Sequence, residues 1–194
     1  MILLVALLLA AEQVAPATPT ANDQCKYEPE DLELGFDAFN QNATAGWRAL
    51  SMRPGCEEAA ANMVRAYRMN AEAHLPLLYW HEAHLPLLYW HEAQLRAVAG
   101  DYTTAIPLME KSRGPTDQDK FGWNAYVDAT IAFLRGDHTA LEKARGRLVA
   151  LPKPSDVDAK RSWPPNLGVV DGLIRCISKS YKVAYGPTCR NDLR

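Results

Sequence analysis

The sequence predicts an all-α protein built from antiparallel helical hairpins, with a disulfide bridge near each end of the folded domain. Several long stretches carry apolar residues at the spacing of an amphipathic helix. A Gly-Asp pair separates two such stretches at two places, Gly100-Asp101 and Gly136-Asp137, which are 36 residues apart. Two of the four cysteines lie in the first third of the chain and two lie close to its end.

The first 22 residues are typical of a secretory signal peptide followed by a flexible lead-in, although the usual basic start is missing. Their apolar run, residues 1–11, is about half as long as a membrane-spanning helix. We therefore expect a periplasmic or secreted protein in which residues 23–194 form a single all-helical domain. We expect no membrane insertion after the signal is removed, and a membrane anchor is the alternative interpretation.

The four cysteines fit an oxidising destination outside the cytosol. They are Cys25, Cys56, Cys176 and Cys189. Three pairings are possible, and proximity in the sequence favours Cys25 with Cys56 and Cys176 with Cys189. Each bridge would stabilise the fold by about 3 kcal/mol, mainly by restricting the unfolded chain. No two cysteines have the spacing of a redox motif or a zinc ribbon.

The balance of charge argues against a nucleic-acid partner. The formal net charge is −2 at pH 7. Basic residues are more frequent in the second half of the chain than in the first, but they form no dense stripe of the kind that binds phosphates.

Three helices are predicted before the middle of the chain. Residues 28–41 carry acidic side chains in their first turn, which suits a helix N-terminus. Residues 47–52 form a short helix that Pro54-Gly55 ends. The stretch 56–73 is rich in alanine and has glutamates in its first turn, so it predicts a longer helix.

The ten residues HLPLLYWHEA occur twice in succession, at 74–83 and 84–93. The second copy extends into a helix that reaches Ala99. Because proline lacks the N–H that would bond the carbonyl of Glu82, we expect a break or sharp kink at 82–86, with Pro86 at the first position of the better helix. Two identical copies are typical of a recent tandem duplication without a function of its own. The alternative is a deliberately extended aromatic surface, formed by Tyr79, Trp80, Tyr89 and Trp90.

Residues 85–151 predict two helical hairpins. A helix carrying Tyr89 and Ala93 precedes the first Gly-Asp turn, and Ala105 and Met109 follow it on a second helix. A poorer unit follows, with predicted helices at 123–135 and 140–151. This arrangement of large and small residues around the turns resembles tetratricopeptide repeats (TPR). The resemblance implies a right-handed α-α superhelix, and the second unit departs from the pattern by having His138 where the repeat has an aromatic residue.

The chain after the hairpins predicts an irregular loop and a last helical segment. Residues 152–165 contain four prolines and no helical period. We expect Asn166 to cap a helix over 167–178, and residues 181–185 to continue it.

Histidines next to the repeat provide the only candidate for metal chemistry. His81 and His84 lie on one helical face with Glu82 next to His81 in the sequence, and His91 follows in the second copy. The zinc-protease pattern places its two histidines four residues apart, whereas these are three apart. The cluster arises from copying a block that holds two histidines, so we favour ordinary solvated or interface histidines.

The sequence therefore predicts an exported interaction module or scaffold with no catalysis of its own and no cofactor. We expect its partner to be another protein or an extended peptide, bound in the inner groove of the hairpins. The candidate groove residues are Tyr89, Trp90, Arg96, Trp123 and Tyr126. The alternative is a helical metal-binding protein or metalloenzyme that uses His81, Glu82, His84 and His91.

Overall fold

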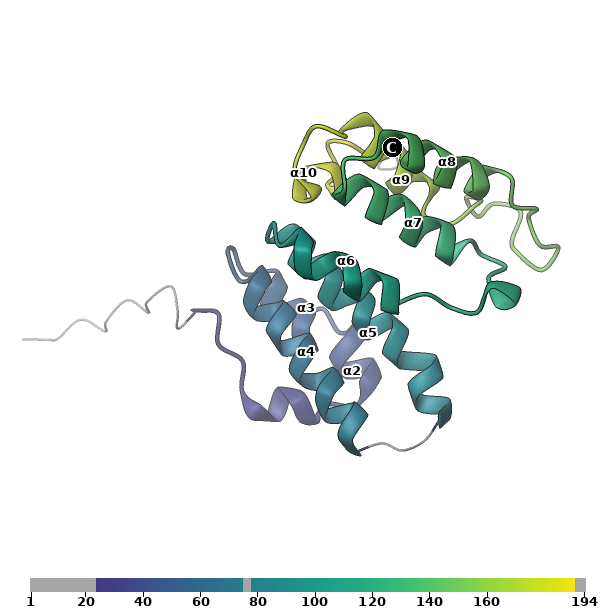
Figure 1. The fold of residues 1–194 in the computed structure, drawn as a ribbon. Helices are drawn as coiled ribbons and strands as arrows, with labels where there is room; N and C mark the ends of the chain where they lie inside the picture. Colours follow the sequence, from purple (N-terminus) through teal and green to yellow (C-terminus); the bar gives the residue numbers. More distant parts are fainter. Residues whose placement is uncertain (1–23, 75–77, 191–194) are drawn as a thin grey trace, which may run out of the picture.

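The computed structural model describes residues 24–74 and 78–190, with side chains described for all of these except 73–83 (Figure 1). The described residues form helices and no strand, which confirms the all-α prediction. None of the helices in these ranges is both long enough and apolar enough to cross a membrane. A short 3-10 helix precedes the α-helices at Pro29–Glu33, and another lies at Thr116–Gln118. The α-helices are α2 (Phe36–Gln41), α3 (Gly46–Ser51), α4 (Glu57–His74), α5 (Leu78–Val98), α6 (Tyr102–Lys111), α7 (Trp123–Leu134), α8 (His138–Val149), α9 (Leu167–Arg175) and α10 (Tyr181–Tyr185).

The two Gly-Asp pairs form the same reverse turn between successive helices. Gly100 and Gly136 have positive φ angles of 92° and 68°, a conformation that glycine adopts without steric cost. The N–H of Asp101 bonds the carbonyl of Arg96, and the N–H of Asp137 bonds that of Ala132, both at 2.9 Å. These bonds, with those of the preceding glycines, satisfy the last carbonyls of α5 and α7 in a Schellman arrangement.

Each aspartate of these turns also caps the helix that follows. The carboxylate of Asp101 accepts the N–H of Thr104 at 3.0 Å, and that of Asp137 accepts the N–H of Ala140 at 2.9 Å. One residue therefore closes one helix and starts the next, which makes a tight hairpin. The predicted hairpins over residues 85–151 are confirmed as α5–α6 and α7–α8.

Two hydrophobic cores are formed, and α5 contributes to both. The N-terminal core joins α2, α3 and α4 to the α5 side chains Leu88 and Leu95. The C-terminal core joins α6 to α10 with the α5 side chains Trp90, Ala93 and Ala97. The α5 helix thus lies between the N-terminal and C-terminal groups of helices (Figure 1).

The disulfide pairing favoured by sequence proximity is confirmed. Cys25 is bonded to Cys56 at the start of α4, and Cys176 is bonded to Cys189 after α9. The first bridge holds the N-terminal segment against α4, and the second holds the chain after α10 against the end of α9. Each bridge belongs to a different core.

Several predicted boundaries differ from those observed. Residues 28–41 form the 3-10 helix and α2 instead of one helix, since Gly35 separates them with extended backbone. Asn166 does precede α9, but it has a left-handed φ of 63° and its side chain makes no capping bond. The last long helix ends at Arg175 instead of residue 178, because Cys176 has left the helical conformation.

The predicted break at 82–86 is wrong, because α5 continues through Pro86. In the first copy of the repeat, α4 ends at His74 and α5 begins at Leu78. Packing on both sides of the proline explains its tolerance inside the helix. Before it, the ring of His84 lies 4.0 Å from that of Phe36; after it, Leu88 is fully buried in the N-terminal core.

Two polar contacts between α4 and α5 involve the second copy of the repeat. The hydroxyl of Tyr89 donates to Glu72 at 2.8 Å, and Arg68 donates to Glu92 at 2.8 Å, one turn further on. These pairs set the register between the two helices. A chain with a single copy of the repeat would keep both of them.

This register makes a specific prediction about the duplication. Deleting either copy of HLPLLYWHEA gives the same chain, in which α4 would lead through Leu-Pro-Leu directly into the part of α5 that contacts it. We expect the melting temperature to stay the same or to rise, because the contacts of Tyr89 and Glu92 with α4 remain and one amphipathic helix then packs against one core. Thermal unfolding followed by circular dichroism measures this.

The control is a deletion of equal length at residues 88–97, which removes Leu88, Trp90 and Ala93 from both cores and should prevent folding. A loss of several degrees in the first variant would show that both copies stabilise the fold.

Candidate functional site

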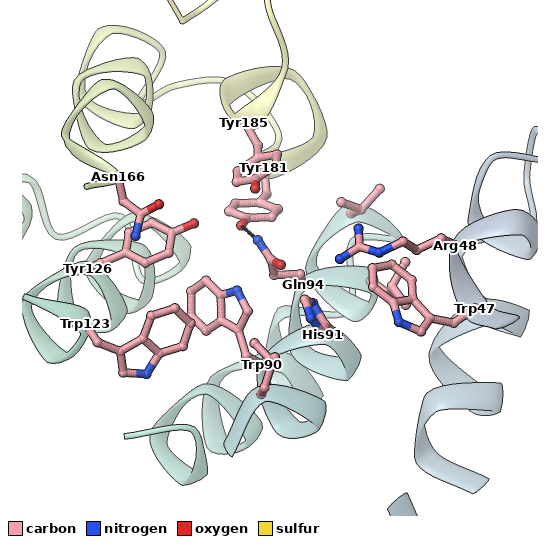
Figure 2. Close-up of a pocket in the computed structure, with 13 residues that line it drawn as sticks. Trp47, Arg48, Trp90, His91, Gln94, Trp123, Tyr126, Asn166, Tyr181 and Tyr185 are labelled. Carbon is pink, nitrogen blue, oxygen red and sulfur yellow. Dashed lines mark hydrogen bonds between the residues drawn. The ribbon is translucent and has the colours of Figure 1, made fainter. Parts of the chain in front are cut away.

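A cleft of about 370 Å³ lies between the two cores (Figure 2). Its walls come from α3, α5, α7, α10 and the residue that precedes α9. Its volume lies at the lower end of the range for ligand-binding clefts. Six aromatic side chains line it: Trp47, Trp90, Trp123, Tyr126, Tyr181 and Tyr185.

Three of these rings form one wall of the cleft. The ring centre of Trp90 lies 4.9 Å from those of both Trp123 and Tyr126, at inclined angles that favour aromatic pairs. The indole N–H of Trp123 donates to the carbonyl of Ser112 at 2.7 Å. That bond fixes the Trp123 ring, which remains partly exposed to the cleft.

The α10 helix provides the opposite wall with Tyr181 and Tyr185. The backbone N–H of Tyr181 donates to the hydroxyl of Tyr102 at 2.9 Å, and the Gln94 amide donates to the Tyr181 hydroxyl at 3.4 Å. Burial raises the pKa values of Tyr126 and Tyr181 above the ordinary value. Both phenols are therefore neutral at physiological pH and act as hydrogen-bonding groups instead of charges.

Arg48 of α3 is the positively charged side chain at one end of the cleft. The guanidinium lies over the ring of Trp47, 4.3 Å from the ring centre, and its Nε donates to the carbonyl of Asn40. Desolvation lowers the pKa of Arg48, while Tyr185 across the cleft opposes this shift. In the described part of the chain no carboxylate forms an ion pair with Arg48.

The imidazole of His91 lies in the floor of the cleft, next to Trp47, with ring centres 4.7 Å apart (Figure 2). Its residue is only 8% exposed, and neither ring nitrogen has a hydrogen-bond partner among the described residues. Desolvation and the charge of Arg48 lower the pKa of His91 to about 4, with Gln94 acting in the opposite sense. A buried polar group without a partner lowers the stability of the folded protein. A ligand that bonds this ring would remove that penalty.

The five predicted groove residues do not lie together. Trp90, Trp123 and Tyr126 line the cleft. The Tyr89 ring instead faces α4, where the guanidinium of Arg68 lies 4.1 Å from its centre. Arg96 also faces α4 and donates to Asn62. Neither Tyr89 nor Arg96 lines the cleft.

The predicted metal ligands are not brought together as far as their side chains are described. His84 contacts Phe36, and His91 contacts Trp47. Their seven-residue separation corresponds to about 10 Å along a helix. The side chains of His81 and Glu82 lie outside the described residues. Among those that are described, no group of three or more His, Cys, Asp or Glu could hold a metal ion.

Sequence reasoning missed the residues that α3 and α10 bring to the cleft: Trp47, Arg48, Tyr181 and Tyr185. These segments are more than a hundred residues apart in the sequence, and no periodicity connects them. A partial signal was present, since α10 carries two tyrosines in five residues and α3 carries a tryptophan.

Comparisons with protein-family models, curated proteins and solved structures found no match to this chain. Its function is therefore inferred from the residues of the cleft.

The buried imidazole predicts a particular dependence of stability on pH. The unfolded chain takes up the His91 proton near pH 6.5, whereas the folded protein does so near pH 4. Protonation therefore favours the unfolded state in this window, and stability falls as the pH decreases from 6.5 to 4. Relative to neutral pH, the titration of His91 should lower the free energy of unfolding by on the order of 2 kcal/mol at pH 4.5.

Because other groups also titrate here, the measurement compares variants by denaturant unfolding at pH 7.5 and 4.5. His91→Gln should lose less stability between the two pH values than the unchanged protein. His138→Gln, which changes an exposed histidine on α8, should lose as much as the unchanged protein. Equal losses in all three proteins would contradict the buried neutral imidazole.

Proposed function

We propose that this protein is an exported interaction module that binds an extended segment of another protein in the cleft, without catalysis of its own. The observation that carries the proposal is the cleft itself, an open concavity whose aromatic walls are held by hydrogen bonds. Rigid aromatic groups are typical anchors of protein interfaces, because they bury a large apolar area at a small entropic cost. The two disulfides support a periplasmic or secreted location.

The chemistry of the cleft suits binding. Its described lining contains a guanidinium, a neutral imidazole, phenols and two amides, but no carboxylate, thiol or serine hydroxyl. These groups orient a ligand through hydrogen bonds. They do not form the pair of nucleophile and base that covalent catalysis uses.

The succession of helices supports a peptide-sized ligand. The helices α3, α5 and α7, which line the cleft, are each followed by a helix that packs against them and stays outside the lining. In a TPR-like superhelix, as we propose here, the first helix of each hairpin would face the inner groove. Such a groove crosses several hairpins and accommodates an extended chain.

A defined peptide library tests this function. We expect a library of random hexapeptides, acetylated and amidated at their ends, to contain members that bind the full-length, disulfide-bonded protein. Because Trp123 is partly exposed in the cleft, Trp123→Ala should weaken the binding of selected peptides by about tenfold or more. Titration calorimetry measures the affinities.

Phe121→Ala is the matched control, since Phe121 is an exposed aromatic residue that packs against Trp163 outside the cleft lining. This variant should bind the selected peptides as the unchanged protein does. The function is rejected if no library member binds, or if both substitutions weaken binding to the same extent.

A further inference from the structure

We propose that the segment bound in the cleft carries an acidic side chain close to an aromatic or aliphatic one, with its carboxylate held by Arg48 and His91. This inference rests on the proposed function and specifies its ligand. It follows from the charge of the cleft, from the unpartnered imidazole and from the distribution of aromatic rings along the walls.

The charge of the cleft is one-sided. Arg48 is its one permanently charged lining residue, since the lining contains no lysine, aspartate or glutamate among the described residues. Among the described residues, only the Nε of Arg48 has a protein hydrogen-bond acceptor, the carbonyl of Asn40. Its two terminal nitrogens can therefore bind a carboxylate side by side, the geometry in which arginine binds carboxylates best.

The imidazole of His91 provides a second hydrogen-bonding group near that position. Arg48 is close enough to influence its ionisation, so both groups act on the same region of the cleft. The ring is buried, lines the cleft, and has no partner for either nitrogen among the described residues. A ligand carboxylate that accepts its N–H would satisfy a polar group that the free protein leaves unsatisfied.

The rest of the cleft is apolar and suits a neighbouring side chain. In Figure 2, Arg48 and Trp47 lie at one end, Trp123 and Tyr126 lie at the other, and His91 and Gln94 lie between them. In an extended peptide, residues i and i+2 point to the same side and lie about 7 Å apart. An acidic residue at i would thus place an apolar residue at i+2 against the Trp123 wall.

A cationic segment fits this cleft poorly, although aromatic rings can bind cations. The charge of Arg48 would repel it, and no carboxylate of the described lining would offset that repulsion. The acidic segment is therefore the occupant that the charge distribution favours.

The test uses paired hexapeptides, acetylated and amidated, with Glu or Gln at position 2 and Phe or Ala at position 4. We expect the Glu/Phe peptide to bind the full-length protein about tenfold more tightly than the Gln/Phe peptide. This preference should fall to about one in Arg48→Met and should persist in part in Arg48→Lys, which keeps the charge but loses the paired donors. Arg135→Gln, an exposed arginine outside the cleft lining, is the control and should keep the full preference.

His91→Gln tests the second group and does not touch the bond between Arg48 and Asn40. It should reduce the preference for Glu about threefold while preserving the effect of Phe at position 4. Melting temperatures measured for every variant identify any that unfold, so that the remaining variants still decide the result.

The outcomes separate this inference from the proposed function. Equal binding of the Glu and Gln peptides, with the Phe peptides still preferred, would overturn the acidic ligand and leave peptide binding intact. Binding by none of the four peptides, with binders present in the random library, would also overturn this inference alone. A Gln/Phe peptide with a free C-terminal carboxylate that binds as tightly as the amidated Glu/Phe peptide would contradict the side-chain carboxylate.

Discussion

The structure depends on one helix, α5, being buried on opposite faces at the same time. Leu88 and Leu95 face the N-terminal core, while Trp90, Ala93 and Ala97 face the C-terminal core. A surface helix needs only one apolar stripe, whereas a helix buried this way must be apolar over most of its circumference. The small side chains of Ala93 and Ala97 on the C-terminal face of α5 allow α6 to pack closely against that face.

The buried carboxylate of α5 is consistent with this position because it is paired inside the protein. Glu92 is 2% exposed and accepts two hydrogen bonds from Arg68 of α4, at 3.3 and 2.8 Å. A carboxylate so deeply buried needs such a partner, and the pair fixes the register between α4 and α5. Glu92 belongs to the second copy of the repeat, as does Tyr89, which donates to Glu72 of α4. Each partner also has a second ion pair, Arg68 with Glu72 at 3.0 Å and Glu92 with Arg96 at 4.0 Å.

The cleft follows from the same geometry. The two cores lie on opposite faces of α5, and the cleft opens between them along this helix. The helices α3 and α10 line the cleft from the N-terminal and C-terminal groups of helices. Most of the polar groups there are held by other parts of the protein: Trp123 by Ser112, and Tyr181 by Tyr102 and Gln94. His91 is the exception, because its nitrogens have no partner among the described residues. The ligand site proposed here rests on this combination of apolar walls and an unsatisfied buried imidazole.

The sequence by itself determined the helices, the Gly-Asp hairpins and the cysteine pairing, because these depend on local periodicity, turn chemistry and short separations along the chain. It also indicated Trp90, Trp123 and Tyr126, which belong to the hairpins themselves. It did not determine the continuity of α5 through Pro86, since the packing of Phe36 and the N-terminal core on that helix is a long-range effect. Nor could it show that Arg48 and Tyr185 face each other across a cleft, or that Tyr89 and Arg96 face α4. Only the tertiary structure decided these, because helix rotation is set by which partner buries each face.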